Sequence, residues 1–172
     1  VWLAGGVLVM LPLPMRMGSI DQLIEQTRDR IRFAKASTVV LDPQLAEFIE
    51  HQPGDPTFLT YADLLPEATG QTAEAWKRPT PDPDALAVLQ FTSGSTSEPK
   101  GVMLAQRQLC ANIDGCYEAA QMSRDDTVVS WLPLYHDMGL IGCLLGAASY
   151  PGPLVLLPPE HFLARPALWL RA

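Results

Sequence analysis

A short loop rich in hydroxyl groups has the residue types that bind a polyphosphate. It lies between two apolar runs, 86–91 and 102–104, and contains Gly94 and Lys100. Glycine allows backbone N–H groups to approach an anion closely, and successive N–H groups in a tight turn form an anion-binding nest. Hydroxyl groups add hydrogen-bond donors, and a lysine adds a positive charge. The predicted phosphate ligands are Thr92, Ser93, Gly94, Ser95, Thr96, Lys100 and Gly101.

The order of residues in this loop excludes the common nucleotide-binding loop, G-x-x-x-x-G-K-S/T, because Pro99 precedes the lysine and Gly101 follows it. A Ser/Thr/Gly hairpin turn without a ligand is the simplest alternative. However, Thr-Ser-Gly-Ser-Thr-x-x-Pro-Lys-Gly resembles the phosphate-binding signature of the adenylate-forming enzymes. These include acyl-CoA synthetases, fatty acyl-AMP ligases and peptide-synthetase adenylation domains. Ser97 departs from the glycine that many members carry.

A second segment, 130–142, reads Ser-Trp-Leu-Pro-Leu-Tyr-His-Asp-Met-Gly-Leu-Ile-Gly. We expect Pro133 to end a strand and 135–137 to begin a helix. Ligands of open α/β sheets bind beyond the carboxyl ends of strands, so we expect this segment and the phosphate loop to face one crevice. The segment looks most like fatty acyl-AMP ligases, as does Pro-Leu-Pro-Met-Arg-Met-Gly-Ser at 12–19.

The resemblance implies that His136 lies between the nucleotide and the acyl chain. We expect Lys100 and His136 to act in catalysis, although a fatty carboxylate is ionised at neutral pH and needs no general base. Small residues follow at helical spacing, at Gly139, Gly142, Cys143, Gly146 and Ala147. Close helix packing is the favoured explanation for this stripe, and the wall of an acyl channel is the alternative. The expected substrate-binding residues are Trp131, His136, Gly139 and Gly142, with core packing favoured for Trp131.

The implied reaction joins a fatty carboxylate to ATP in the presence of Mg²⁺, giving acyl-AMP and pyrophosphate. The acyl group then passes to a carrier-protein thiol or, alternatively, to coenzyme A. A nucleotide- or acyl-binding domain without activity is a further alternative, against which the intact loop with Lys100 argues. The resemblance implies that 1–172 is a fragment of the N-terminal adenylation domain. The residues for adenine, ribose and metal and the C-terminal lid are absent, so we expect this fragment alone to be inactive.

Apolar runs alternate with amphipathic stretches, which predicts an α/β fold with a mainly parallel sheet and helices on both faces. The charged cluster Arg28, Asp29, Arg30 and Arg32 is interpreted as a solvated helix face, and 67–84 as a surface connection. Ser19 with Gln22, and Asp42 with Pro43, are predicted helix starts. Expected strands are 7–11, 38–41, 57–61, 86–91, 127–132 and 154–157. Expected helices are 19–34, 42–51, 61–65, 105–122, 135–150 and 160 onward, with a helix end at 2–6.

The net charge, the positions of cysteine and histidine, and the apolar segments exclude further classes of function. The formal net charge of −7 argues against a nucleic-acid partner. Three cysteines without metal-type spacing fit reduced thiols in the cytoplasm, and three scattered histidines give no metal site. The apolar segments 1–15 and 138–157 are interrupted by proline, so we expect buried core rather than a transmembrane segment. The chain lacks an initial methionine and ends in an apolar stretch, 167–172, that reads as the middle of a helix, which also indicates a fragment.

Overall fold

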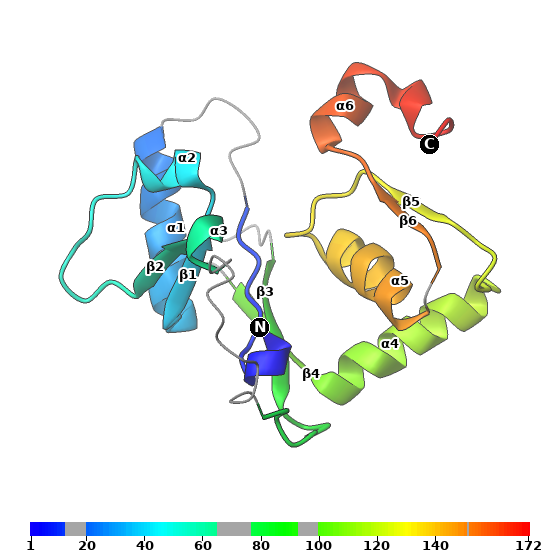
Figure 1. The fold of residues 1–172 in the computed structure, drawn as a ribbon, viewed down its shortest axis with the longest axis horizontal. Helices are drawn as coiled ribbons and strands as arrows, with labels where there is room; N and C mark the ends of the chain where they lie inside the picture. Colours follow the sequence, from blue (N-terminus) through cyan, green and yellow to red (C-terminus); the bar gives the residue numbers. More distant parts are fainter. Residues whose placement is uncertain (13–19, 65–76, 93–99, 151) are drawn as a thin grey trace, which may run out of the picture. The chain divides into compact units, whose positions relative to one another are not determined.

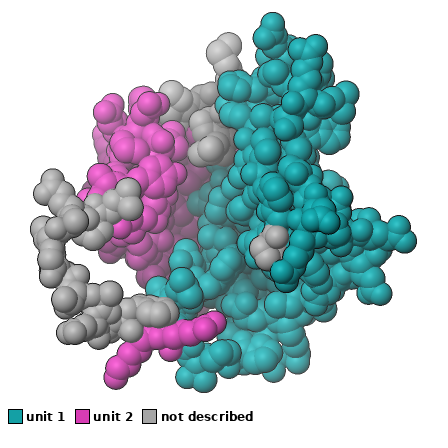
Figure 2. Space-filling view, turned by 45° about the vertical axis from the view of Figure 1, so that its right-hand side comes forward, with its two compact units in different colours: residues 1–12, 79–172 teal, residues 13–78 magenta. Residues whose placement is uncertain are grey.

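The computed structural model describes residues 1–12, 20–64, 77–92, 100–150 and 152–172 (Figure 1). The chain divides into two compact units, which are coloured separately in Figure 2. Unit 1 consists of residues 1–12 and 79–172, and unit 2 consists of residues 13–78. The predicted cap Ser19, the loop residues 93–99 and most of the predicted connection 67–84 lie outside the described residues.

Unit 2 has the predicted alternation of helices and strands. Its elements are α1 (Ile20–Ala34), β1 (Thr38–Leu41), α2 (Pro43–Ala46), β2 (Thr57–Thr60) and α3 (Tyr61–Leu64). β1 and β2 pair in parallel along their whole lengths. The Asp42 carboxylate accepts the backbone N–H of Gln44 at 2.8 Å and so caps α2, as the Asp-Pro pair predicts.

The prediction that the helix after Asp42 continues to about residue 51 is wrong, because α2 ends at Ala46. The N–H groups of Phe48 and Ile49 bond to carbonyl groups three residues back, at 3.1 and 3.2 Å. Bonds of this tighter type occur where an α-helix ends. The chain then turns at Gly54, whose φ of 87° is a left-handed conformation that side chains rarely adopt.

Arg28 corrects the interpretation of the charged cluster as a solvated face. Its guanidinium group donates to both oxygens of Asp55 at 2.7 Å and to the backbone carbonyl of Glu50. Both side chains of the ion pair are only 10% exposed. Arg28 lies one helical turn from Ile24 and Ile31, so it shares their inward face. A partner 27 residues away in the sequence makes this burial favourable, which helical spacing alone does not reveal.

Replacing Arg28 by methionine in the complete protein is expected to lower the melting temperature at pH 7 by several degrees, because Asp55 keeps its charge without its partner. The hydrogen bond from Arg28, more than that from the Gln52 N–H, holds the pKa of Asp55 below its ordinary value. That stabilisation is present at neutral pH and is lost as the pH falls through the lowered pKa. The difference between wild type and variant should therefore shrink below about pH 4.

The matched control is Arg32→Met on the same helix. Arg32 pairs with Asp29 at 3.3 Å, but these side chains are 62% and 59% exposed. An exposed pair contributes little, so this substitution should shift the melting temperature by about one degree or less. Equal shifts for the two variants, or a difference that does not change between pH 7 and acid, would count against a buried ion pair at Arg28.

Unit 1 contains the two segments predicted to carry chemistry. Its strands are β3 (Leu86–Thr92), β4 (Lys100–Ala105), β5 (Val128–Ser130) and β6 (Leu154–Leu156). Its helices are η1 (Trp2–Ala4), α4 (Gln106–Ala119), η3 (Met138–Leu145), α5 (Gly146–Ser149), α6 (Pro159–Ala164) and η4 (Pro166–Leu168). η1 ends at Gly5, which has a left-handed backbone as the predicted helix end requires.

The strand pairings confirm an α/β fold in which parallel pairing predominates among the described strands. β1–β2 and β5–β6 are parallel, and η3 and α5 connect β5 to β6 in the predicted strand–helix–strand order. The departure is the pairing of β3 with β4, which is antiparallel (Figure 1). The predicted strand 7–11 is reduced to one parallel bridge between Leu8 and Val88. Pro12 has no N–H group with which to continue that pairing.

The core of unit 1 joins β3, α4 and η3. Its buried members are Ala87, Val88, Leu109, Ile113, Tyr117, Leu140 and Ile141. The predicted apolar face of α4 is therefore correct at 109, 113 and 117, whereas Cys116 and Ala120 are exposed. α4 packs against η3 and α5 (Figure 1). Since β3 and η3 share one core, the end of β3 and the turn that precedes η3 are anchored to the same framework.

The apolar segment 138–157 is divided, as predicted, between helical residues and strand β6. The expected helix from residue 160 onward is also divided, because α6 ends at Ala164 and a separate 3-10 turn begins at Pro166. Proline disfavours a helical conformation in the residue before it, which explains the break at Arg165. Within the described residues, no helix combines the length and apolar character that crossing a membrane requires.

Candidate functional site

The described residues of the predicted phosphate loop form the neck of a hairpin. β3 ends at Thr92 and β4 begins at Lys100, and these two residues are partners in the antiparallel register. Gly101 is the partner of Phe91 one step further from the loop. Thr92 and Lys100 are exposed, so a hydroxyl group and an ammonium group stand at the base of the loop. Ser93, Gly94, Ser95 and Thr96 lie outside the described residues.

A hydrogen bond connects this hairpin to the second predicted segment. The side-chain amide of Gln90 donates from Nε2 to the backbone carbonyl of Tyr135 at 3.2 Å. Gln90 is 6% exposed and lies two residues before Thr92. Tyr135 immediately precedes His136. This bond places the end of β3 beside the turn that contains His136, and a crevice shared with the phosphate loop stays a prediction.

His136 lies in a turn before the helix rather than inside it. Its backbone N–H donates to the carbonyl of Pro133 at 3.1 Å. The helix begins at Met138, whose N–H donates to the Asp137 carboxylate at 2.6 Å, so it starts one to three residues later than the expected start at 135–137. The same carboxylate lies 2.7 Å from Nδ1 of His136, whose side chain is 60% exposed. Asp137 thus fixes both the helix start and the direction of the imidazole, a role that sequence reasoning missed.

The helix after His136 is a π-helix over Met138–Leu145, whereas an α-helix was predicted. Glycines at 139 and 142 weaken the preference for an α-helix, and π-helical turns are frequent at functional sites. A Cβ atom on Gly139 would lie 2.4 Å from the carbonyl oxygen of Pro133. Among the atoms of the described residues, a Cβ atom on Gly142 would have only Met138 Cγ within 4 Å, at 3.9 Å. Close packing therefore explains Gly139, whereas the half-buried Gly142 has more open surroundings.

Tyr117 supports the far end of the small-residue stripe. Its ring would lie 2.4 Å from a Cβ on Gly146, so only glycine fits there without a shift. The Tyr117 hydroxyl donates to the carbonyl of Gly142 at 3.5 Å, and the ring stacks on Tyr150 at 4.9 Å. Burial raises the pKa of Tyr117, and the hydrogen bond to Asp114 raises the pKa of Tyr150. Both phenols therefore stay neutral and serve packing.

Trp131 packs against an aromatic neighbour. Its ring is stacked on Phe162 with ring centres 3.9 Å apart and an angle of 3° between the planes. Trp169 meets the edge of Phe162 and donates from Nε1 to the carbonyl of Val129 at 2.8 Å. Trp131 is half-buried by these contacts, and packing is the role that the structure displays for it.

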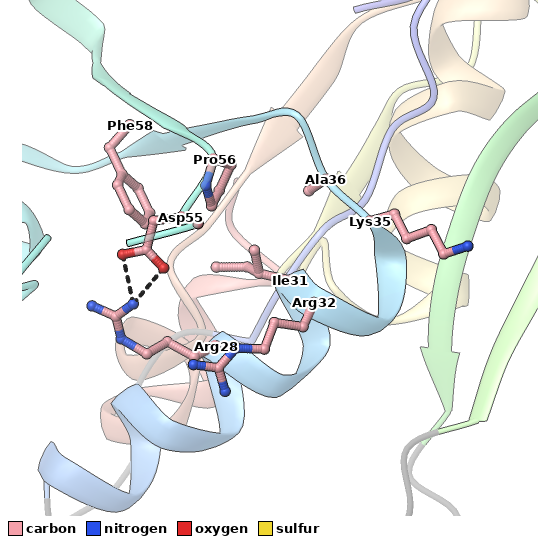
Figure 3. A pocket seen from close by; sticks show the side chains of 9 residues that line it. Arg28, Ile31, Arg32, Lys35, Ala36, Asp55, Pro56 and Phe58 are labelled. Atoms are coloured by element: carbon pink, nitrogen blue, oxygen red, sulfur yellow. Dashed lines mark hydrogen bonds and ion pairs between the residues drawn. The ribbon is translucent and has the colours of Figure 1, made fainter. Parts of the chain in front are cut away.

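Unit 2 contains a cavity that sequence reasoning missed. It has a volume of about 260 Å³. Figure 3 shows the Arg28–Asp55 pair on one side, with Ile31 and Phe58 nearby and the Lys35 side chain extending away. None of the predicted site residues that the structure describes lines it. Across the described parts of the chain, no group of three or more His, Cys, Asp or Glu is placed to bind a metal ion.

Comparison with known proteins identifies the family of the whole chain. The profile of the family described as AMP-binding enzyme matches residues 1–172. A putative acyl-CoA synthetase of Caulobacter vibrioides is 36% identical over 161 residues, which are 93% of this chain and 28% of that protein. The medium-chain-fatty-acid–acyl-carrier-protein ligase JamA of Moorena producens is 37% identical over 110 residues, 64% of this chain and 18% of JamA.

Among solved structures, one from a study of fatty acyl-adenylate ligases of E. coli and L. pneumophila is similar, with a TM-score of 0.83 and 32% identity. The match covers 98% of this chain and 30% of that one. The chain belongs to the AMP-binding enzyme family. It spans less than a third of the length of these relatives.

Proposed function

We propose that the protein containing this chain activates a fatty carboxylate with ATP, giving acyl-AMP and pyrophosphate, and passes the acyl group to a carrier-protein thiol in the cytoplasm. The observation that carries the proposal is the hydrogen bond from Gln90 to Tyr135. It joins the base of the phosphate loop to the His136 turn, in a chain that matches the AMP-binding enzyme family throughout. In this proposal the chain forms the early part of a larger adenylation domain.

The proposed chemistry is one of charge neutralisation. A carboxylate oxygen forms a bond to the α-phosphorus of ATP, and the bond from that phosphorus to pyrophosphate breaks, so pyrophosphate leaves with the electron pair. Cations and backbone donors that stabilise negative charge on the leaving group lower this barrier. Thr92 and Lys100 are exposed at the hairpin neck and fit this task. Residues 93–96 and Gly101 complete the proposed phosphate cradle.

Mg²⁺ is the proposed metal ion, and it would shield the phosphate charge. Mg²⁺ sites commonly use one or two carboxylates together with phosphate oxygens. The described residues offer no cluster of metal ligands. We assign its carboxylate ligand to the metal-binding glutamate that the family resemblance implies, in a part of the protein beyond this chain.

The proposed acyl entrance lies beside His136. The imidazole is exposed and directed by Asp137, so it can shape the space between the nucleotide and the acyl chain. Gly142 suits a channel wall better than Gly139, because the direction of a side chain on Gly139 is filled by backbone. In this proposal Trp131 lies behind the entrance and supports it through its stacking contact with Phe162.

Transfer to coenzyme A is the second candidate, and the similarity to a putative acyl-CoA synthetase favours it. The similarity to JamA, whose name specifies an acyl-carrier-protein ligase, favours the first. Both candidates share the adenylation step and differ in the thiol that accepts the acyl group.

The test is product identification with the complete protein. It would be incubated with ATP, Mg²⁺, a medium-chain fatty acid and coenzyme A, and the products identified by mass spectrometry. We expect acyl-AMP without acyl-CoA, and acyl-carrier protein once a phosphopantetheinylated carrier is added. Acyl-CoA as the product would establish the second candidate. If none of several acids gave acyl-AMP, the remaining interpretation would be a domain that binds a nucleotide or an acyl chain without catalysing a reaction.

A further inference from the structure

Gln90 is a polar side chain in the middle of a buried strand. Its neighbours Ala87 and Val88 are fully buried, and Gln90 itself is 6% exposed. A buried amide is unfavourable unless its donors and acceptors are bonded, so this position requires a specific partner. That partner is the carbonyl of Tyr135, 45 residues further along the chain.

The two ends of this hydrogen bond both lie next to predicted site residues. Gln90 precedes Thr92 by two residues, and Thr92 faces Lys100 across the hairpin neck. Tyr135 precedes His136 in a turn that is closed by the bond from the His136 N–H to Pro133. A displacement of this turn relative to β3 would change the spacing between the phosphate loop and His136.

The geometry points to Gln90 as a positioning residue for adenylation, a role that rests on the proposed function. Its amide holds the His136 turn at a fixed distance from the base of the phosphate loop. The bound carboxylate is thereby aligned with the α-phosphorus. Misplacement by about 1 Å lowers a reaction rate by up to about a hundredfold, so loss of this bond should slow the chemical step. Nucleotide affinity should change little, because the phosphate ligands stay in place.

The test compares Gln90→Met with Gln108→Met in the complete protein. Gln108 also uses its side chain to bond a backbone group, accepting the N–H of Ala105 at 2.8 Å, but it lies at the start of α4. Acyl-AMP formation would be measured with kcat and the KM for ATP separated, alongside melting temperature. For Gln90→Met we expect kcat to fall about tenfold with the KM for ATP within about twofold. Gln108→Met should leave both unchanged.

Gln90→Asn is the second variant. It keeps an uncharged amide but is one methylene shorter, so its N–H donor no longer reaches the Tyr135 carbonyl. It should also lower kcat, and it decides the question where Gln90→Met fails to fold. If the melting temperature falls while kcat stays unchanged, Gln90 has only a structural role and the inference is overturned. A wild type that forms no acyl-AMP would overturn the proposed function and this inference together. An active wild type with unaffected Gln90 variants overturns the inference alone.

Discussion

Replacing Lys100 by methionine in the complete protein should lower kcat/KM for acyl-AMP formation by at least about a hundredfold, as removal of one donor to a developing anion does in other enzymes. Lys100 stands at the first residue of β4, opposite Thr92, where its ammonium group is exposed at the base of the loop. Methionine keeps the length of the side chain and removes the charge. The measurement is the initial rate of acyl-AMP formation at several ATP concentrations.

Lys35→Met is the matched control for this substitution. Lys35 is also exposed, but it belongs to unit 2 and lies beyond the end of α1. It should leave kcat/KM unchanged. Lys100→Arg keeps a positive charge and should retain more activity than Lys100→Met. If Lys100→Met and Lys35→Met had the same activity, Lys100 would not be a phosphate ligand.

Gly139→Ala should destabilise the complete protein by about 2–3 kcal/mol through overpacking. The added methyl group would lie 2.4 Å from the carbonyl oxygen of Pro133 and 3.0 Å from that of Leu132. These are backbone atoms, so relief requires movement of the segment that carries His136. Melting temperature and acyl-AMP formation should therefore fall together.

Gly115→Ala, on α4, is the matched control, and we expect it to stabilise the protein rather than destabilise it. No atom of the described residues lies within 4 Å of a Cβ on Gly115, so the alanine gains helix propensity of about 0.8–1 kcal/mol without a clash among them. The melting temperature should rise slightly and activity should not change. A melting temperature for Gly139→Ala that matches wild type would show that η3 does not pack closely on the Pro133 carbonyl.

Local patterns predicted the parts of the fold that depend on neighbours in sequence. The run at 86–91 is a strand that is mostly buried, and Asp42 caps its helix. Sequence patterns did not predict features that depend on a partner far away in the sequence. Arg28 is buried because Asp55 meets it, and Gly139 in the π-helix packs closely against the backbone of the preceding turn. The antiparallel hairpin was expected only as the alternative without a ligand, because alternation of apolar runs does not specify strand direction.

The candidate site was predicted by motif rather than by periodicity. The spacing of Thr92 and Lys100 placed both at one loop, and their pairing across the hairpin neck agrees with this. Gln90 was visible as the polar residue of an apolar run, but its partner was not, because Tyr135 lies 45 residues away. The direction of His136 depends on the adjacent Asp137, whose type alone does not tell whether it caps a helix or binds a ligand.

The central claim is that the protein forms an acyl-adenylate, and exchange of radiolabelled pyrophosphate into ATP tests it most directly. This exchange reports the reversible adenylation step and is independent of the thiol that later accepts the acyl group. With the complete protein and Mg²⁺, we predict exchange that requires a fatty acid and is lost in Lys100→Met but not in Lys35→Met. ATP binding without fatty-acid-dependent exchange would contradict the account.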